Sequence, residues 1–264
     1  MIEGINIRCN VGPFEVLRSP RVVLTYARRA VVSTCEIVIP DPDGQVCAGL
    51  EKKQKVKIRF GHRGEGGTWH EWEGTIKDFT AELDAMRVFC VGLEQALIDT
   101  KITQAMHGEP ADIVAKRLFG ATGLAVDKIE IEPQVFPHIV FSDVTVARAI
   151  KQLSQSLERS FGIDMSAHAV WLGENGLCWS AGNEPGPTYI IETAQNLISC
   201  SPNPRGMSYV VSTLIPGLTA SMEVRIRDKL REYSELVRAE EVIHTLSGDG
   251  NTTKIGYGVN SGWG

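Results

Sequence analysis

The sequence predicts an α+β protein that is mainly β, with two antiparallel β-barrel lobes flanking a small α+β lobe. Runs that alternate apolar and polar residues, separated by turn residues, fill the beginning and the end of the chain. Helical periodicity is confined to the middle. We therefore expect a first barrel over residues 1–99, an α+β lobe over 100–187, a second β lobe over 188–255 and a glycine-rich flexible tail over 256–264.

The first lobe is predicted from four alternating runs within residues 36–93. Four such runs separated by turns describe an antiparallel meander that curls into a barrel. The strand over residues 31–39 ends at two prolines, because proline cannot donate to a β-ladder. Trp72, Gly74 and Ile76 share one parity, so we expect them on the same face of a strand.

The middle lobe is predicted to hold two helices and a hairpin. The first helix opens at Glu109-Pro110, since a proline in the first turn costs little. The second helix has Ser142 or Asp143 as its N-cap and ends at Gly162. A hairpin over residues 163–180 completes this lobe.

The last lobe again shows alternating apolar and polar residues. Apolar and charged residues alternate over 222–227, and residues 237–246 are expected to pair with residues 252–257. The charged segment between them, residues 228–236, is predicted to be a loop or a short helical turn. The glycines of residues 256–264 predict a flexible tail or one that a partner orders.

The composition is that of an ordinary globular protein, with 43% hydrophobic and 22% charged residues. The net charge of −5 argues against nucleic acid as the main partner, because phosphate binding needs clustered lysine and arginine. No apolar run approaches the roughly 20 residues that span a bilayer, and no signal peptide is evident. We expect folding in a cytoplasm, with six scattered cysteines as buried hydrophobes.

No catalytic set, cofactor site or metal site emerges from the sequence. The glycine-rich turn at Gly61, Gly64, Gly66 and Gly67 leads into a strand at Trp69, whereas a phosphate-binding loop leads into a helix. We therefore interpret this turn as a hairpin tip.

Three other patterns contain residue types that are used in catalysis or binding. The segment Asp41-Pro42-Asp43-Gly44 lacks the further oxygen ligands of a calcium loop and is predicted to be a turn between strands. Glu71 and Glu73 share a strand face, and paired carboxylates can hydrolyse glycosides, but a solvated surface is the commoner arrangement. Tryptophans can stack on sugars, but those of this chain lie in two lobes, which favours packing.

Four segments, in this order, carry a resemblance to a known family. Residues 35–60 contain a strand, Asp-Pro-Asp-Gly, a leucine and a strand of alternating basic and apolar residues. Trp72-Glu73-Gly74-Thr75-Ile76 follows the hairpin loop, and Leu214-Ile215-Pro216-Gly217-Leu218 leads to Met222-Glu223-Val224. Val242-Ile243-His244-Thr245 precedes the last turn. Over about residues 20–257, the chain resembles the baseplate hub proteins of contractile-tailed phages, a family that includes the N-terminal part of type VI secretion spike proteins.

This resemblance implies a structural role and no enzymatic activity. Hubs of this family are homotrimers in which each subunit contributes two related tube-like barrels, so that three subunits present a pseudo-sixfold ring. The ring adapts the sixfold tail tube to the threefold central spike. The implied partners are copies of the chain itself, the tail tube protein, the spike protein and other baseplate proteins. The implied location is the tail baseplate of a virion, assembled in the cytoplasm of the host bacterium.

The expected contact surface is the glycine hairpin, with Gly61, Gly64, Gly66, Gly67, Trp69 and Trp72 as its residues. Two alternatives remain open. A carbohydrate-binding tail or adhesin module would use the tryptophans, and a cell-wall hydrolase would use Glu71 or Glu73.

Overall fold

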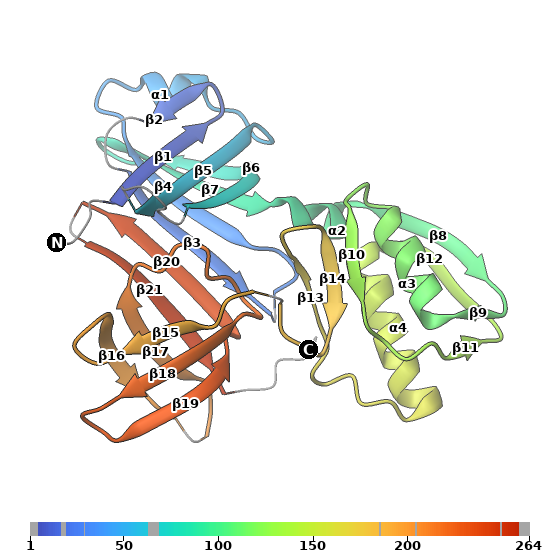
Figure 1. The fold of residues 1–264 in the computed structure, drawn as a ribbon. Coiled ribbons are helices and arrows are strands. Elements are labelled where there is room, and N and C mark those ends of the chain that lie inside the picture. Colours follow the sequence, from blue (N-terminus) through green and yellow to red (C-terminus); the bar gives the residue numbers. More distant parts are fainter. Residues whose placement is uncertain are drawn as a thin grey trace. The chain divides into compact units, whose positions relative to one another are not determined.

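The computed structural model describes residues 5–16, 20–28, 30–62, 69–184, 186–203, 205–248 and 250–258 (Figure 1). The chain forms two compact units. The first unit takes in the described residues up to Tyr26, Val32–Leu93 and the described residues from Gly186 to Gly258. The second consists of Ala27–Val31 and Glu94–Pro185. The three predicted boundaries, at residues 99, 187 and 255, remain predictions.

An 11-stranded sheet dominates the first unit, in the order β16-β17-β21-β20-β3-β4-β7-β6-β5-β1-β2 (Figure 1). Its strands are β1 (Ile5–Val11), β2 (Phe14–Val16), β3 (Arg21–Ala27), β4 (Thr34–Pro40), β5 (Lys55–His62), β6 (Trp69–Ala81), β7 (Ala85–Gly92), β16 (Leu197–Ser201), β17 (Ser208–Thr213), β20 (Glu241–Ser247) and β21 (Gly250–Tyr257). The mainly β, α+β class is confirmed. The two predicted barrels are not, because the pairing of the described strands leaves this sheet open, with β2 and β16 as its edges.

Strand β3 lies between β4 and β20 in the sheet. It therefore connects the strands from the beginning of the chain with those from its end. A second sheet covers the later half of this unit and consists of β15 (Tyr189–Glu192), β18 (Glu223–Asp228) and β19 (Tyr233–Arg238). Leu214 and Leu246, from the later half, pack in the core of the earlier half. Tyr26 packs against both cores. The two halves therefore share a sheet and part of their cores.

The second unit packs its two longer helices beside small sheets (Figure 1). Its elements, with the short 3₁₀ turn η1 (Leu93–Gln95) leading into them, are α2 (Ala96–Asp99), β8 (Lys101–Met106), β9 (Glu109–Pro110), α3 (Ala111–Gly120), β10 (Val126–Ile129), β11 (Val135–Phe136), β12 (Ile139–Thr145), α4 (Val146–Phe161), β13 (Ala169–Leu172) and β14 (Leu177–Ser180). The apolar stripes of α3 and α4 meet in one core, which includes Leu118, Ile150 and Leu153. Gly162 ends α4 with a left-handed backbone at φ 70°, as predicted.

The predicted N-cap of α4 is wrong. The helix is capped by Thr145, whose hydroxyl oxygen accepts a hydrogen bond from the backbone N–H of Arg148. Ser142 and Asp143 belong to β12 instead, at a bulge where the register with β8 shifts. Asp143 takes a positive φ of 46°, which aspartate tolerates better than most residues. Asx and Ser residues favour bulges and turns as well as caps, so the sequence pattern alone did not separate the two.

One segment predicted as a loop contains regular structure. Residues 233–236 of the expected loop belong to β19, which pairs with β18 along its whole length. Three successive residues of this edge strand, Ser234, Glu235 and Leu236, are exposed, so it does not show the period-two alternation of a half-buried strand. The Asp41–Gly44 turn leads into a short helix, α1 (Gln45–Gly49), whose Val46 and Cys47 N–H groups donate to the Asp41 carboxylate.

The segment predicted as a tail is partly structured. Gly256 and Tyr257 belong to β21, and the Tyr257 side chain is buried in the later core. Residues 259–264 lie outside the described residues. The strand predicted over residues 237–246 is divided between two strands. Val237 and Arg238 are the last residues of β19, and β20 begins at Glu241.

Candidate interface

The inner face of the β5–β6 hairpin is core, as its parity predicted. Trp72, Gly74 and Ile76 are all buried. The Trp72 ring is 4% exposed, and its Nε1 donates a hydrogen bond of 3.0 Å to Oγ of Ser33. Trp72 would therefore contribute to an interface only by holding β6 in place.

Gly74 lies where the backbone of β7 approaches β6 closely. A Cβ at this position would lie 2.3 Å from the carbonyl oxygen of Val91 and 2.5 Å from the Trp72 ring. Carbon atoms do not approach so closely, so strands β6 and β7 pack at this distance only because residue 74 has no side chain. The aromatic-x-Gly-x-Ile pattern thus has a packing reason.

The outer face of the hairpin is a charged ladder. Lys57 of β5 forms ion pairs with Glu71 and with Glu73 of β6, the second at 2.8 Å. Hydrogen bonds with Glu71 and then Glu73 raise the pKa of Lys57. All three side chains are about half exposed, at 46–49%. The two carboxylates therefore lie on an open, ion-paired surface.

Trp69 marks the outer end of this ladder. The Cζ atom of Arg59 lies 4.8 Å from the Trp69 ring centroid, which is a cation–π contact. Gly61 pairs with Trp69 across the hairpin and with Asn6 of β1 on its other side. The predicted contact residues Gly64, Gly66 and Gly67 fall in residues 63–68, outside the described part of the chain. Gly61 and Trp69 thus form the base of the predicted contact hairpin.

Two histidines meet between the halves of the first unit. His70 of β6 and His244 of β20 have ring centroids 6.0 Å apart, and Phe60 packs against both rings. The Tyr26 hydroxyl lies 2.6 Å from Nε2 of His70. Sequence reasoning missed this cluster, although His244 has the same parity as the buried Val242 and Leu246.

The surroundings keep both histidines neutral. Burial lowers the pKa of His70 to about 4. Burial, together with the charge of His70, lowers the pKa of His244 to about 3. The two nitrogens of His244 are within hydrogen-bond distance of Thr253 Oγ1, at 3.0 Å, and of the Leu218 carbonyl oxygen, at 2.8 Å. This cluster joins strands and leaves no ring nitrogen of His244 for a substrate.

Exposed apolar side chains occur at turns and at a sheet edge. Leu83 in the β6–β7 turn is 102% exposed, and Leu230 in the β18–β19 turn is 84% exposed. Ile198, at 57%, lies on β16, an edge of the large sheet. Edge strands with exposed apolar residues invite pairing with another chain, so these positions are candidate contacts.

The described residues contain no group of three or more metal-ligating side chains. His107 and His138 face each other, with their Nδ1 atoms 2.9 Å apart, but lack a third ligand within the same described set. No helix in the described ranges is long and apolar enough to span a bilayer.

Comparison with known proteins identifies the fold. No family model and no curated protein matches the sequence. Two solved structures match almost from end to end. The 43 kDa tail protein of prophage MuSo2 from Shewanella oneidensis aligns with a TM-score of 0.66 and 12% identity, over 96% of this chain and 97% of its own. A tail protein from Neisseria meningitidis MC58 aligns with a TM-score of 0.69 and 12% identity, over 98% of both chains.

The chain has the fold of these phage tail proteins. The same fold extends to the Escherichia coli c3393 protein, a type VI secretion component described as similar to the T4 phage tail proteins gp27 and gp5. That match has a TM-score of 0.63 and 9% identity, and covers 98% of this chain and 78% of the other. The resemblance inferred from the sequence motifs is confirmed at the level of the fold.

Proposed function

We propose that this chain is a structural protein of a phage or phage-like contractile tail, and that it serves as the baseplate hub. The observation that carries the proposal is the end-to-end match with two phage tail proteins, 96–98% of this chain against 97–98% of theirs. A match of this extent includes both the β-rich unit and the α+β unit. A shared fold alone does not fix a function, so the surfaces must supply the rest of the argument.

The hub is a homotrimeric ring. Each subunit contributes the two halves of its β-rich unit, so three subunits offer six β positions to a sixfold tube and three equivalent positions to a spike. The shared sheet and the shared core residues of the two halves support this role, since they join the halves in one compact unit. A ring also needs contacts between different surfaces of neighbouring copies. The edge strand β16 and the Trp69 hairpin are candidates for those surfaces.

The partners of the hub are the tail tube protein on one side, the spike protein on the other and further baseplate proteins around it. The hub is assembled in the host cytoplasm and ends in the virion baseplate. The β5–β6 hairpin, with Gly61 and Trp69 at its described base, is the proposed contact toward the neighbouring subunit or the tube. Its outer ladder of Lys57, Glu71 and Glu73 gives that contact both signs of charge.

The two alternative functions lack a supporting observation. A sugar-stacking face needs exposed aromatic rings, but Trp72, Trp171 and Trp179 are at most 7% exposed. Arg59 already stacks on Trp69. A glycosidase of the usual kind needs two carboxylates facing each other across a cleft, whereas Glu71 and Glu73 bind one lysine on an open strand face.

Light scattering of the purified chain after gel filtration tests the hub proposal. We expect a mass three times the 28.9 kDa of one chain, held across micromolar concentrations. Trimer formation should weaken when Ile198 on edge β16 is replaced by lysine, while the far-ultraviolet circular dichroism spectrum is unchanged. A wild-type chain that remains a clean monomer over the same range would contradict the proposal.

A further inference from the structure

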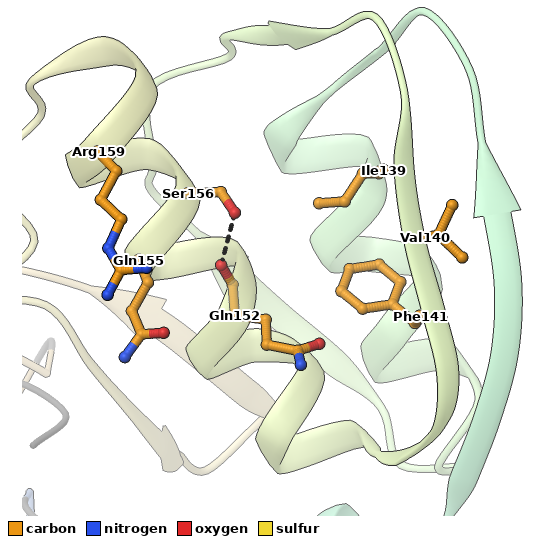
Figure 2. A pocket seen from close by; sticks show the side chains of 7 residues that line it. All are labelled: Ile139, Val140, Phe141, Gln152, Gln155, Ser156 and Arg159. Atoms are coloured by element: carbon orange, nitrogen blue, oxygen red, sulfur yellow. Dashed lines mark hydrogen bonds between the residues drawn. The ribbon is translucent and has the colours of Figure 1, made fainter.

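A groove of about 360 Å³ runs between β12 and α4 in the second unit (Figure 2). Its strand side is formed by three successive residues of β12: Ile139, Val140 and Phe141. Successive side chains of a strand point to opposite faces, so a space that touches all three follows the edge of the strand. Figure 2 shows Ile139 and Phe141 on the side of the helix and Val140 on the opposite side.

That edge of β12 is free for pairing. Strand β12 pairs with β8 from Ile139 to Thr145, and within the described ranges these two strands form a sheet of their own. An edge strand presents a row of N–H and C=O groups that another extended chain can use. Phe141, which is 1% exposed, gives the groove an apolar floor, and Val140, on the other face of the strand, is 52% exposed.

The helix side of the groove is polar. Gln152, Gln155, Ser156 and Arg159 line it at the spacing of a single helical face. The Ser156 hydroxyl donates to the Gln152 carbonyl oxygen at 2.8 Å and is already engaged (Figure 2). In the same view the Gln152 amide points toward Phe141, whereas the Gln155 amide lies on the other side of the helix, beside Arg159. The Gln152 amide offers both a donor and an acceptor to a chain that lies in the groove.

The charge of the groove is positive. Arg159 is exposed and forms no ion pair with the described residues, and no carboxylate is among the residues that line the groove. Arg148 lies on the same helical stripe, one turn before Gln152, and is also exposed. Arg159 and Ile139 both line the groove, whereas Arg148 lies close to the connection between β12 and α4. A guanidinium selects carboxylates, which it can bind through two parallel hydrogen bonds.

We propose that the β12–α4 groove binds an extended segment of a partner protein as an added strand on β12. The segment places an apolar side chain over Phe141 and an aspartate or glutamate side chain against Arg159. Main-chain hydrogen bonds to the β12 edge provide affinity, while the floor and the arginine provide selectivity, as in other cases of strand addition. This docking site lies in the second unit and does not depend on the hub proposal.

Fluorescence anisotropy with two labelled peptides tests the site on the full chain. The first peptide, Glu-Thr-Val-Thr-Val-Thr-Glu, is extended and offers a carboxylate in either direction, and the second carries lysine in place of both glutamates. We expect the acidic peptide to bind about 5-fold or more tightly than the basic one. Arg159→Glu should reverse this order. Lys151→Glu, the same change of charge outside the groove lining, should preserve it.

Filling the groove gives an independent test. Ser156→Trp places a large ring between helix and strand and should weaken binding of the acidic peptide about 10-fold or more. A circular dichroism melt checks that this variant is folded, and if it is not, the charge reversal decides. Three results would each overturn the proposal: equal affinity for the two peptides, no saturable binding up to about 1 mM, or unchanged binding by folded Ser156→Trp.

Discussion

The hydroxyl of Tyr26 on β3 lies 2.6 Å from Nε2 of His70 on β6, beside the imidazole of His244 on β20. These three rings bring together strands from the beginning and the end of the chain. The cluster lies where the two halves of the large sheet meet, because β3 is the strand that neighbours β20. The packing of the first unit therefore depends on both histidines being neutral.

The two histidines should make the first unit sensitive to acid. Their pKa values are about 4 and about 3 when folded, below the value near 6.5 of an exposed histidine. The unfolded chain therefore binds more protons below pH 6.5, and stability falls as the pH drops from about 6.5 toward 4. We expect a loss on the order of 3 kcal/mol for each histidine, measured by urea unfolding at several pH values.

His70→Gln checks the cause of this pH dependence. The variant should show a shallower decline of unfolding free energy, by about 1.4 kcal/mol per pH unit between pH 6 and pH 4. Tyr26→Phe is the matched control, since it removes the hydroxyl beside His70 and keeps both imidazoles. It should lower the free energy of unfolding by about 1 kcal/mol, and that free energy should decline with falling pH as in the wild-type protein. If His70→Gln also keeps that decline, the histidine is not responsible.

Gly74→Ala should destabilise the first unit. The added methyl group would lie 2.3 Å from the Val91 carbonyl oxygen, which is backbone and cannot turn aside. We expect a loss of about 1–3 kcal/mol in urea unfolding, the usual cost of overpacking. Gly186→Ala is the control in the same unit, because no atom lies within 4 Å of its added carbon. A change of stability as large in Gly186→Ala would contradict the packing argument.

Arg28 should stabilise the second unit. Its buried guanidinium donates hydrogen bonds to the carbonyl oxygens of Ala167, Ser180 and Gly182 at 3.1–3.2 Å and stacks over Trp171. Arg28→Met would leave these carbonyls without the cation, at a cost of about 3 kcal/mol. Hydrogen exchange should show faster opening of β13 and β14. Arg148→Met, at an exposed site, should leave exchange in these strands unchanged.

Replacement by alanine should lower the free energy of unfolding much more at Trp72 than at Trp69. Trp72→Ala removes a buried ring and should cost about 3–5 kcal/mol of unfolding free energy. Trp69→Ala should cost about 1 kcal/mol or less, because the ring is partly exposed and loses mainly its contact with Arg59. If the hairpin is a contact between subunits, Trp69→Ala should nevertheless weaken trimer formation in light scattering. Unchanged assembly would remove the hairpin from the interface.

Period-two alternation predicted most of the strands in the first unit. Val56, Ile58 and Phe60 are buried as their parity requires, and the same holds for Val224 and Ile226. The helices of the second unit were found from their apolar stripes and from Gly162. These features depend on residues close in the chain, and such patterns are visible in a sequence.

Features that depend on distant residues were not predicted. Nothing in Arg21–Ala27 indicates that β3 lies beside β20, more than 200 residues later. Separate barrels were expected because each lobe shows its own alternation, and alternation carries no information on which strands pair across lobes. The edge strand β19 and the bulge at Asp143 were missed for a related reason. Their residue types also suit loops and caps, and pairing with β18 and β8 decided the outcome.

Electron microscopy of the purified chain tests the central claim most directly. Class averages of negatively stained particles, taken at the concentration used for light scattering, show symmetry without any assumption about partners. We predict a ring with threefold symmetry, a central channel and six β-rich positions around it. Particles of single-chain size without symmetry, or a closed dimer, would contradict the account of this chain as a tail hub.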